Sequence, residues 1–120
     1  MSEKISDTEK LPQKSFDIHL VSDATGTSLQ SLTRGVLAQF DHIDPTEWFW
    51  PLVRTEKQLR RVIENIKEHP GPVLFTFVDN RQRERFQDAC ADLGVPNIPV
   101  LDPVIKGLSA YLQIPAKGVP

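Results

Sequence analysis

The chain has 120 residues, of which 39% are hydrophobic and 25% are charged, and this composition suits a single folded domain. A formal net charge of −2 argues against a nucleic-acid-binding protein, and no apolar run is long enough to span a bilayer. The single cysteine, Cys90, excludes an internal disulfide framework and a multi-cysteine metal site. We therefore expect a cytoplasmic protein with no dedicated metal site.

Residues 1–14 are polar and mixed in charge. They lack the apolar centre of a secretory signal, and they are not the Arg-rich, acid-poor segment of a transit peptide. We expect a disordered leader over residues 1–14 and one α/β domain over residues 15–115.

The first predicted unit is an apolar strand over residues 16–22, which runs directly into a helix. Apolar residues recur at helical spacing in that helix: Leu29, Leu32, Val36, Leu37 and Phe40. Residues 41–45 end the helix, and the aromatic residues 47–53 predict a second strand. Because Pro51 lies inside that strand, we expect it at an edge of the sheet or at a bulge.

The second half of the chain continues the alternation. Thr55, with Gln58 three residues later, matches a capping box, and the helix that follows ends near residues 69–71. The apolar residues 72–78 predict a strand covered on both faces. A helix over residues 81–93 ends at Gly94, a short strand covers residues 98–101, and a last helix covers residues 104–112.

Four strands that alternate with four helices predict a parallel sheet with helices on both faces. We therefore predict an α/β three-layer sandwich of Rossmann-like type. The first and third strands are the most apolar and should be central, which favours the strand order 2-1-3-4.

Polar residues follow each predicted strand, and the carboxyl ends of parallel strands share the edge where open α/β sheets bind ligands. The candidate residues at this edge are Ser22, Asp23, Thr25, Gly26, Thr27, Arg54, Thr55, Asp79, Asn80, Arg81 and Asp102. Arg54 and Arg81 could clamp a phosphate group. Asp23, Asp79 and Asp102 are the candidate catalytic residues, able to take a proton or to hold a metal through oxygen. For Asp79 and Asp102 the alternative is an ordinary helix cap.

The segment from Ser22 to Thr27 carries more oxygen-bearing side chains than one helix cap needs, and free helical N–H groups favour anions. We interpret Ser22, Thr25, Gly26 and Thr27, together with Arg54, as candidate phosphate-binding residues. The alternative for Gly26 is a purely conformational role. The chain contains neither G-x-x-x-x-G-K-[ST] nor G-x-G-x-x-G, so no recognised nucleotide loop is present.

Four segments, in chain order, carry a family resemblance: HLVSDATGTSLQSL, WPLVRTEKQL, VLFTFVD and VLDPVIKGLSAYL. Together they resemble the N-terminal half of the pyruvate, phosphate dikinase regulatory proteins, also known as phosphoenolpyruvate synthase regulatory proteins or DUF299. The resemblance runs from about residue 16 to the C-terminus, and the wording of the segments favours the dikinase branch.

The resemblance implies a bifunctional serine/threonine kinase and phosphorylase. Members of this family phosphorylate a target threonine with ADP and remove the phosphate with inorganic phosphate, which releases pyrophosphate. Their phosphate-binding loop lies in the C-terminal half, so it maps to no residue here. On this basis we expect residues 116–120 to begin a linker to an absent C-terminal phosphate-loop domain, and we expect this chain alone to be inactive.

Two alternatives remain open from the residues themselves. The aromatic second strand, with Trp48 and Trp50, could belong to an interaction or dimerisation module, so a homodimer is possible. The chain could also be a small phosphate-binding domain without catalysis. His19 and Cys90 are interpreted as structural residues of the sheet and core.

Overall fold

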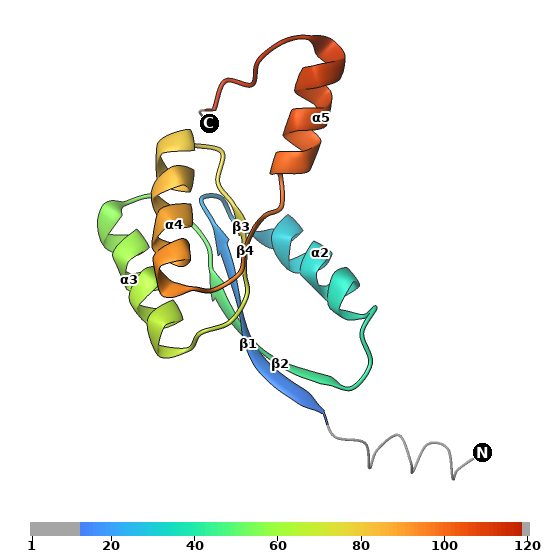
Figure 1. Ribbon diagram of the computed structural model, residues 1–120, viewed down its shortest axis with the longest axis vertical. Coiled ribbons are helices and arrows are strands. Elements are labelled where there is room, and N and C mark those ends of the chain that lie inside the picture. The colour runs from blue at the N-terminus through green and yellow to red at the C-terminus, as the bar shows by residue number, and fades with distance from the viewer. Residues whose placement is uncertain (1–12, 119–120) are drawn as a thin grey trace, which may run out of the picture.

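A computed structural model describes residues 13–118, in which four strands and four helices alternate along the chain (Figure 1). The strands are β1 (Lys14–Ser22), β2 (Ile43–Trp50), β3 (Val73–Thr76) and β4 (Asn97–Pro99). The helices are α2 (Thr27–Leu37), α3 (Glu56–Glu68), α4 (Asn80–Leu93) and α5 (Asp102–Leu112). The expected leader of residues 1–14 lies almost wholly outside the described residues, although Lys14 already belongs to β1.

The sheet is parallel throughout, and its order is β2-β1-β3-β4, as predicted. The β1–β2 pairing runs from Lys14 opposite Ile43 to Val21 opposite Trp50. The β1–β3 pairing is shorter and begins at His19 opposite Val73. The α/β Rossmann-like arrangement is therefore confirmed, with β2 and β4 at the edges.

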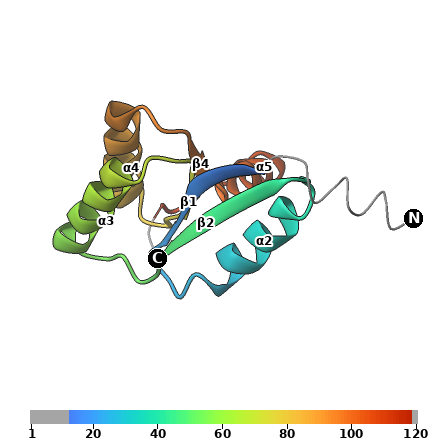
Figure 2. The same cartoon turned by 90° about the horizontal axis from the view of Figure 1, so that it is seen from below.

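Side chains of the central strands alternate between two cores, as the two-residue period of a strand requires. Helices α3 and α4 cover one face of the sheet and α2 lies on the other (Figure 2). Val21, Val73 and Phe75 point toward α3 and α4, whereas Ile18 and Leu20 point toward α2. The positions of the strand ends, and hence of the candidate site, follow from this packing.

Local signals in the sequence explain where the helices begin and end. The Thr55 hydroxyl accepts a hydrogen bond from the Gln58 backbone N–H at 3.1 Å, and the Gln58 side chain bonds back to the Thr55 N–H, which completes the predicted capping box. Gly94 ends α4 in the left-handed conformation, with φ of 72°.

Several predicted bounds are wrong. Strand β1 begins at Lys14 rather than at residue 16, and β3 covers Val73–Thr76 rather than residues 72–78. The second strand occupies Ile43–Trp50 rather than residues 47–53, so Pro51 follows the strand and Pro45 lies inside it. Proline is tolerated there because β2 is an edge strand, with one side free of ladder hydrogen bonds. The fourth strand is shorter than expected, and α5 begins at Asp102, two residues early, because Pro103 suits the first turn of a helix.

The two tryptophans of β2 lie on the same face of the sheet and are half-buried. The Trp48 ring stacks on the His69 ring, with 4.4 Å between centroids, and its Nε1 donates to the Asp17 carboxylate at 2.9 Å. Trp50 packs against the core beneath α3. The edge position of this strand is thus confirmed, but its tryptophans do not stand out from the surface.

Helices α2 and α5 leave apolar side chains exposed. In α2, Leu29 is buried as predicted, but Leu32 and Val36 remain exposed, as does Phe40 beyond the helix end. Helix α5 has no buried residue. The face of the sheet under α2 is therefore only partly covered.

Candidate functional site

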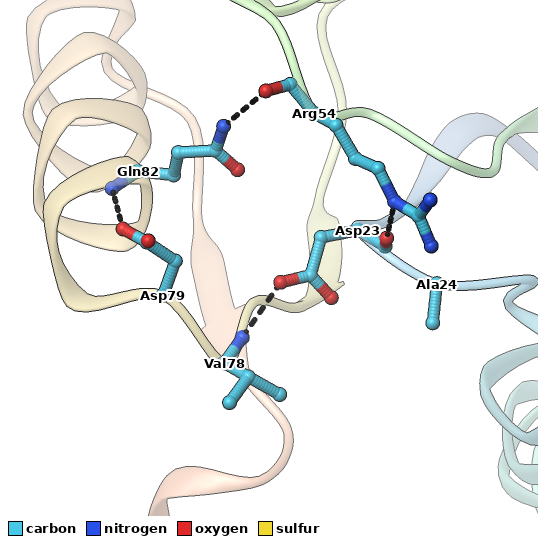
Figure 3. A pocket seen from close by; sticks show the side chains of 6 residues that line it. All are labelled: Asp23, Ala24, Arg54, Val78, Asp79 and Gln82. Carbon is cyan, nitrogen blue, oxygen red and sulfur yellow. Dashed lines mark hydrogen bonds between the residues drawn. The ribbon is translucent and has the colours of Figure 1, made fainter. Parts of the chain in front are cut away.

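A pocket of about 430 Å³ opens at the carboxyl edge of the sheet (Figure 3). Six residues from the ends of β1, β2 and β3 and from the start of α4 line it: Asp23, Ala24, Arg54, Val78, Asp79 and Gln82. Three of the predicted site residues, Asp23, Arg54 and Asp79, therefore do lie together at this edge.

Asp23 follows β1 directly and is held by the loop that follows β3. Its Oδ2 accepts a hydrogen bond from the backbone N–H of Val78 at 2.9 Å (Figure 3). Its own backbone N–H donates to the Thr76 carbonyl at 3.3 Å. Within residues 13–118, Oδ1 has no hydrogen-bond partner. The carboxylate is thus fixed in orientation with one oxygen free to accept a proton from a bound molecule.

Arg54 lies after β2 and is held from three sides. Its Nε donates to the Asp23 carbonyl at 2.8 Å, and its backbone N–H donates to Gln58 Oε1 at 2.8 Å. Its carbonyl accepts from the Gln82 side-chain amide at 2.6 Å (Figure 3). No hydrogen bond within the described part of the chain uses Nη1 or Nη2. A fixed guanidinium with free terminal donors is suited to an anion.

Asp79 caps the N-terminus of α4, and this is the alternative that the sequence offered to a catalytic role. Its Oδ1 accepts from the Gln82 backbone N–H at 3.1 Å, while the Gln82 side chain reaches Arg54. Asp79 also lines the pocket. Gln82 therefore links two of the predicted residues, although the sequence interpretation did not name it. The Asp-x-x-Gln spacing of a helix start was the signal that could have found it.

Asp102 and Arg81 do not share this pocket. Asp102, in the first turn of α5, pairs with Arg83, whose Nη1 lies 3.0 Å from Oδ1, in a neighbouring pocket. Arg83, another residue that the sequence interpretation missed, also bonds Asn80. Arg81 lies in a separate pocket on α4 with Glu84 and Asp88. The single polar edge expected from the sequence is thus divided into separate sites.

The Ser22–Thr27 segment divides into a buried and an exposed part. Ser22 is buried, and its Oγ accepts from the Ala24 N–H at 3.0 Å and from the Thr76 hydroxyl at 2.9 Å, so it ties β1 to β3. The hydroxyl groups of Thr25 and Thr27 are exposed and lie 3.4 Å apart.

Gly26 is the N-cap of α2 and has φ of 77°, in the left-handed region. A Cβ at this position would lie 2.7 Å from the Phe49 ring, so both backbone angle and space require glycine. No side chain caps α2. Its first N–H groups therefore lack a side-chain acceptor, at the same edge of the sheet as Arg54.

The thiol of Cys90 does not line the pocket at the carboxyl edge. Cys90 is fully buried in the core beneath α4, and burial raises the pKa of its thiol to about 12. It packs as a small apolar side chain, in agreement with its sequence interpretation.

Within residues 13–118, no three His, Cys, Asp or Glu side chains are grouped so as to hold a metal ion. In the same range, no helix is long and apolar enough to cross a membrane.

Comparison with known protein families bears on this polar edge. The family model described as kinase/pyrophosphorylase matches residues 18–120, which include every element from the middle of β1 onward. The chain belongs to this kinase/pyrophosphorylase family. The description of this family names phosphoryl chemistry, and the residues that line the pocket all lie within the matched segment.

Individual relatives agree with the family assignment. A protein of Paramagnetospirillum magneticum is 46% identical over 107 residues, which are 89% of this chain and 34% of the relative. A Brucella anthropi protein is 45% identical over 105 residues, which are 88% of this chain and 38% of the relative. Both are named as pyruvate, phosphate dikinase regulatory proteins. The chain thus spans little more than a third of the length of these relatives, and the resemblance to their family is confirmed.

Proposed function

We propose that this chain is the N-terminal part of a bifunctional regulator of pyruvate, phosphate dikinase or of phosphoenolpyruvate synthase. The names of its relatives and the description of its family support this proposal. In the kinase direction, the terminal phosphoryl group of ADP passes to a threonine hydroxyl of the target, and AMP and a proton are released. In the reverse regulation, inorganic phosphate attacks the phosphothreonine, which restores the hydroxyl and forms pyrophosphate. The protein acts in the cytoplasm.

The pocket residues suit parts of this chemistry. The free Nη donors of Arg54 would hold a phosphate oxygen, either on inorganic phosphate or on the phosphothreonine. The α2 N-terminus, with Thr25 and Thr27, adds donors at the same edge. Asp23, with one free carboxylate oxygen, is our choice for the group that accepts a threonine proton. The Asp79 carboxylate caps α4, and the Asp102 carboxylate pairs with Arg83. We assign these two residues the roles of positioning their neighbours and stabilising the fold.

Catalysis by this chain alone is not part of the proposal. The 120 residues contain no phosphate-cradling loop, and one arginine in an open pocket does not supply the several charges that phosphoryl transfer requires. ADP and inorganic phosphate are therefore proposed as substrates of a longer protein, whose additional residues complete the site. Serine/threonine kinase activity and nucleotide binding belong to that protein.

A chimaera tests the proposed function. Residues 18–120 of this chain replace the matching segment of the Paramagnetospirillum magneticum relative, and transfer from ADP labelled on its terminal phosphate to the dikinase is measured. The relative itself is the positive control. We expect transfer by the chimaera and none by the 120-residue chain. A stably folded chimaera without transfer, beside an active relative, would reject the proposal.

A second candidate function is an interaction or dimerisation module, and a third is phosphate binding without catalysis. The exposed apolar surfaces beneath α2 and along α5 support the second candidate. We assign the contact surface of such a module to these surfaces rather than to the aromatic strand β2. Binding of inorganic phosphate at Arg54 would be common to the first and third candidates, and transfer by the chimaera distinguishes them.

A further inference from the structure

The pocket at the carboxyl edge presents hydrogen-bond donors and an acceptor that are anchored to each other. Arg54 Nε donates to the Asp23 carbonyl at 2.8 Å, so the guanidinium is held by the residue that supplies the carboxylate. Asp23 Oδ2 in turn accepts the Val78 N–H at 2.9 Å (Figure 3). Within residues 13–118, Asp23 Oδ1 and both Nη atoms of Arg54 take part in no hydrogen bond. A molecule bound by both groups must therefore offer an acceptor to Arg54 and a donor to Asp23.

The charge of the pocket argues against an anion that carries no proton. Two carboxylates, of Asp23 and Asp79, line the pocket beside the single guanidinium of Arg54. An oxoanion without an O–H group would be attracted by Arg54 but repelled by both carboxylates, which accept hydrogen bonds and donate none. An O–H group on the oxoanion replaces one of these repulsions by a charge-assisted hydrogen bond. The lining thus favours a protonated oxoanion.

Phosphate groups differ in this proton near neutral pH. Inorganic phosphate keeps at least one P–OH group, because its last proton leaves only in strongly alkaline solution. A phosphothreonine side chain loses its last P–OH proton with a pKa of about 6 and is mostly a dianion at pH 7. Sulfate has no O–H group at neutral pH. A carboxylate that accepts a proton therefore separates inorganic phosphate from the other two anions.

We infer that this pocket binds inorganic phosphate rather than the phosphothreonine of the target, and that Asp23 determines this choice. The inference rests on the proposed function and narrows it, because Arg54 alone would hold either phosphate group. In the bound state, the Arg54 Nη atoms donate to phosphate oxygens, and the P–OH group donates to Asp23 Oδ1. An anion that lacks this donor leaves the Asp23 oxygen unpaired against a negative charge and is rejected.

Anion titrations of the 120-residue chain test the inference. Inorganic phosphate, sulfate and methyl phosphate, which stands in for the phosphothreonine, are compared at about pH 7.5, where methyl phosphate is mostly a dianion. Thermal unfolding at matched ionic strength gives each dissociation constant through linkage. We expect inorganic phosphate to bind at least about tenfold more tightly than the other two. Equal binding of phosphate and sulfate would overturn the inference, and so would no stabilisation by any of the three.

Two variants remove the same charge from different places in the pocket. In Asp23→Asn the amide oxygen can still accept the Val78 N–H, while the NH2 group replaces the free acceptor by a donor. The ratio of the sulfate and phosphate dissociation constants should then fall to about one. Asp79→Asn should strengthen the binding of all three anions and keep the ratio of the parent. A ratio that survives in Asp23→Asn, or that is lost in Asp79→Asn, would contradict the role of Asp23.

Two further measurements separate this inference from variant folding and from the proposed function. In the parent chain, lowering the pH to about 5 restores the last P–OH group of methyl phosphate, which should then gain on sulfate. A constant ratio between these two anions would reject the inference without any variant. The chimaera reports on the regulator itself. Transfer by the chimaera, beside equal binding of phosphate and sulfate by the chain, would reject the role of Asp23 and retain the proposed function.

Discussion

The His19 ring donates its Nε2 hydrogen to the backbone carbonyl of His69 at 2.7 Å, and so joins the centre of the sheet to the C-terminal end of α3. His19 is fully buried, and within residues 13–118 its Nδ1 atom has no hydrogen-bond partner. The neutral imidazole therefore suits this position, since protonation would place a charge and an unsatisfied N–H inside the core.

The first prediction concerns the pH dependence of stability. Burial lowers the pKa of His19 below the ordinary histidine value of 6.5, and this effect outweighs the opposing effects of the His69 carbonyl and Asp17. His19 therefore binds a proton more readily in the unfolded chain than in the folded chain. The free energy of unfolding keeps its full value above pH 6.5 and falls as the pH drops below 6.5. Urea unfolding at pH values from 8 to 5 measures this loss.

Matched variants identify the group responsible. His19→Gln keeps an amide donor for the His69 carbonyl but does not titrate, so its unfolding free energy should change less steeply below pH 6.5. His42→Gln, directly before β2 and outside the core, should keep the steep slope. An unchanged slope in His19→Gln would show that another group causes the acid sensitivity.

The second prediction concerns phosphate binding at Arg54. If its free Nη donors bind the anion, inorganic phosphate at about ten times its dissociation constant should stabilise the chain by about 1.4 kcal/mol through linkage. Arg54→Gln should abolish this stabilisation, which thermal unfolding with and without phosphate measures. Arg60→Gln, which removes the same charge from the exposed face of α3, should retain it. Equal responses from both variants would indicate nonspecific salt effects.

The third prediction separates backbone strain from crowding at Gly26. Gly26→Ala should lower the free energy of unfolding by about 2–4 kcal/mol, because it combines a left-handed backbone with a clash against the Phe49 ring. Gly94→Ala has a similar φ but no atom within 4 Å of the added Cβ, so it should cost only about 1–2 kcal/mol. Chemical denaturation of the two variants measures both losses of unfolding free energy. Equal losses would contradict a clash with the Phe49 ring.

The fourth prediction assigns roles among the carboxylates in the active chimaera described above. Asp23→Asn should lower kcat by about 10²–10⁴-fold, the range expected for loss of a general base. Asp79→Asn should mainly lower stability, because its carboxylate caps α4. The values of kcat for the two variants are compared at a temperature at which both are folded. Comparable rates for Asp23→Asn and the parent would remove Asp23 from the proposed mechanism.

The sequence predicted the strand order because β1 and β3 are apolar on both faces, and only central strands are buried on both sides. It misplaced β2 because residues 41–45, with Pro45, were interpreted only as the break after the preceding helix, and the aromatic residues 47–53 as the strand. Pro45 nevertheless lies inside β2, since the free side of an edge strand needs no donor. Backbone pairing with β1, which no local pattern records, decides where β2 begins.

Site prediction from the sequence was limited by a different factor. Strand ends brought Asp23, Arg54 and Asp79 to one pocket, as the parallel topology requires. The separation of Asp102 depends on Arg83 and on the direction in which α5 leaves the sheet. Such side-chain pairings arise from tertiary packing, so a rule based on strand ends placed Asp102 in the wrong group.

The central position of β1 also constrains the order in which the chain can fold. Ser22 and Thr76, whose hydroxyl groups bond across β1 and β3, are 54 residues apart in the chain. Such long-range parallel pairing is slow, because the entropy of closing the loop is lost before the contacts form. During synthesis, β1 must therefore wait with an open edge until β3 has emerged, and this interval is when a nascent chain is most exposed to aggregation.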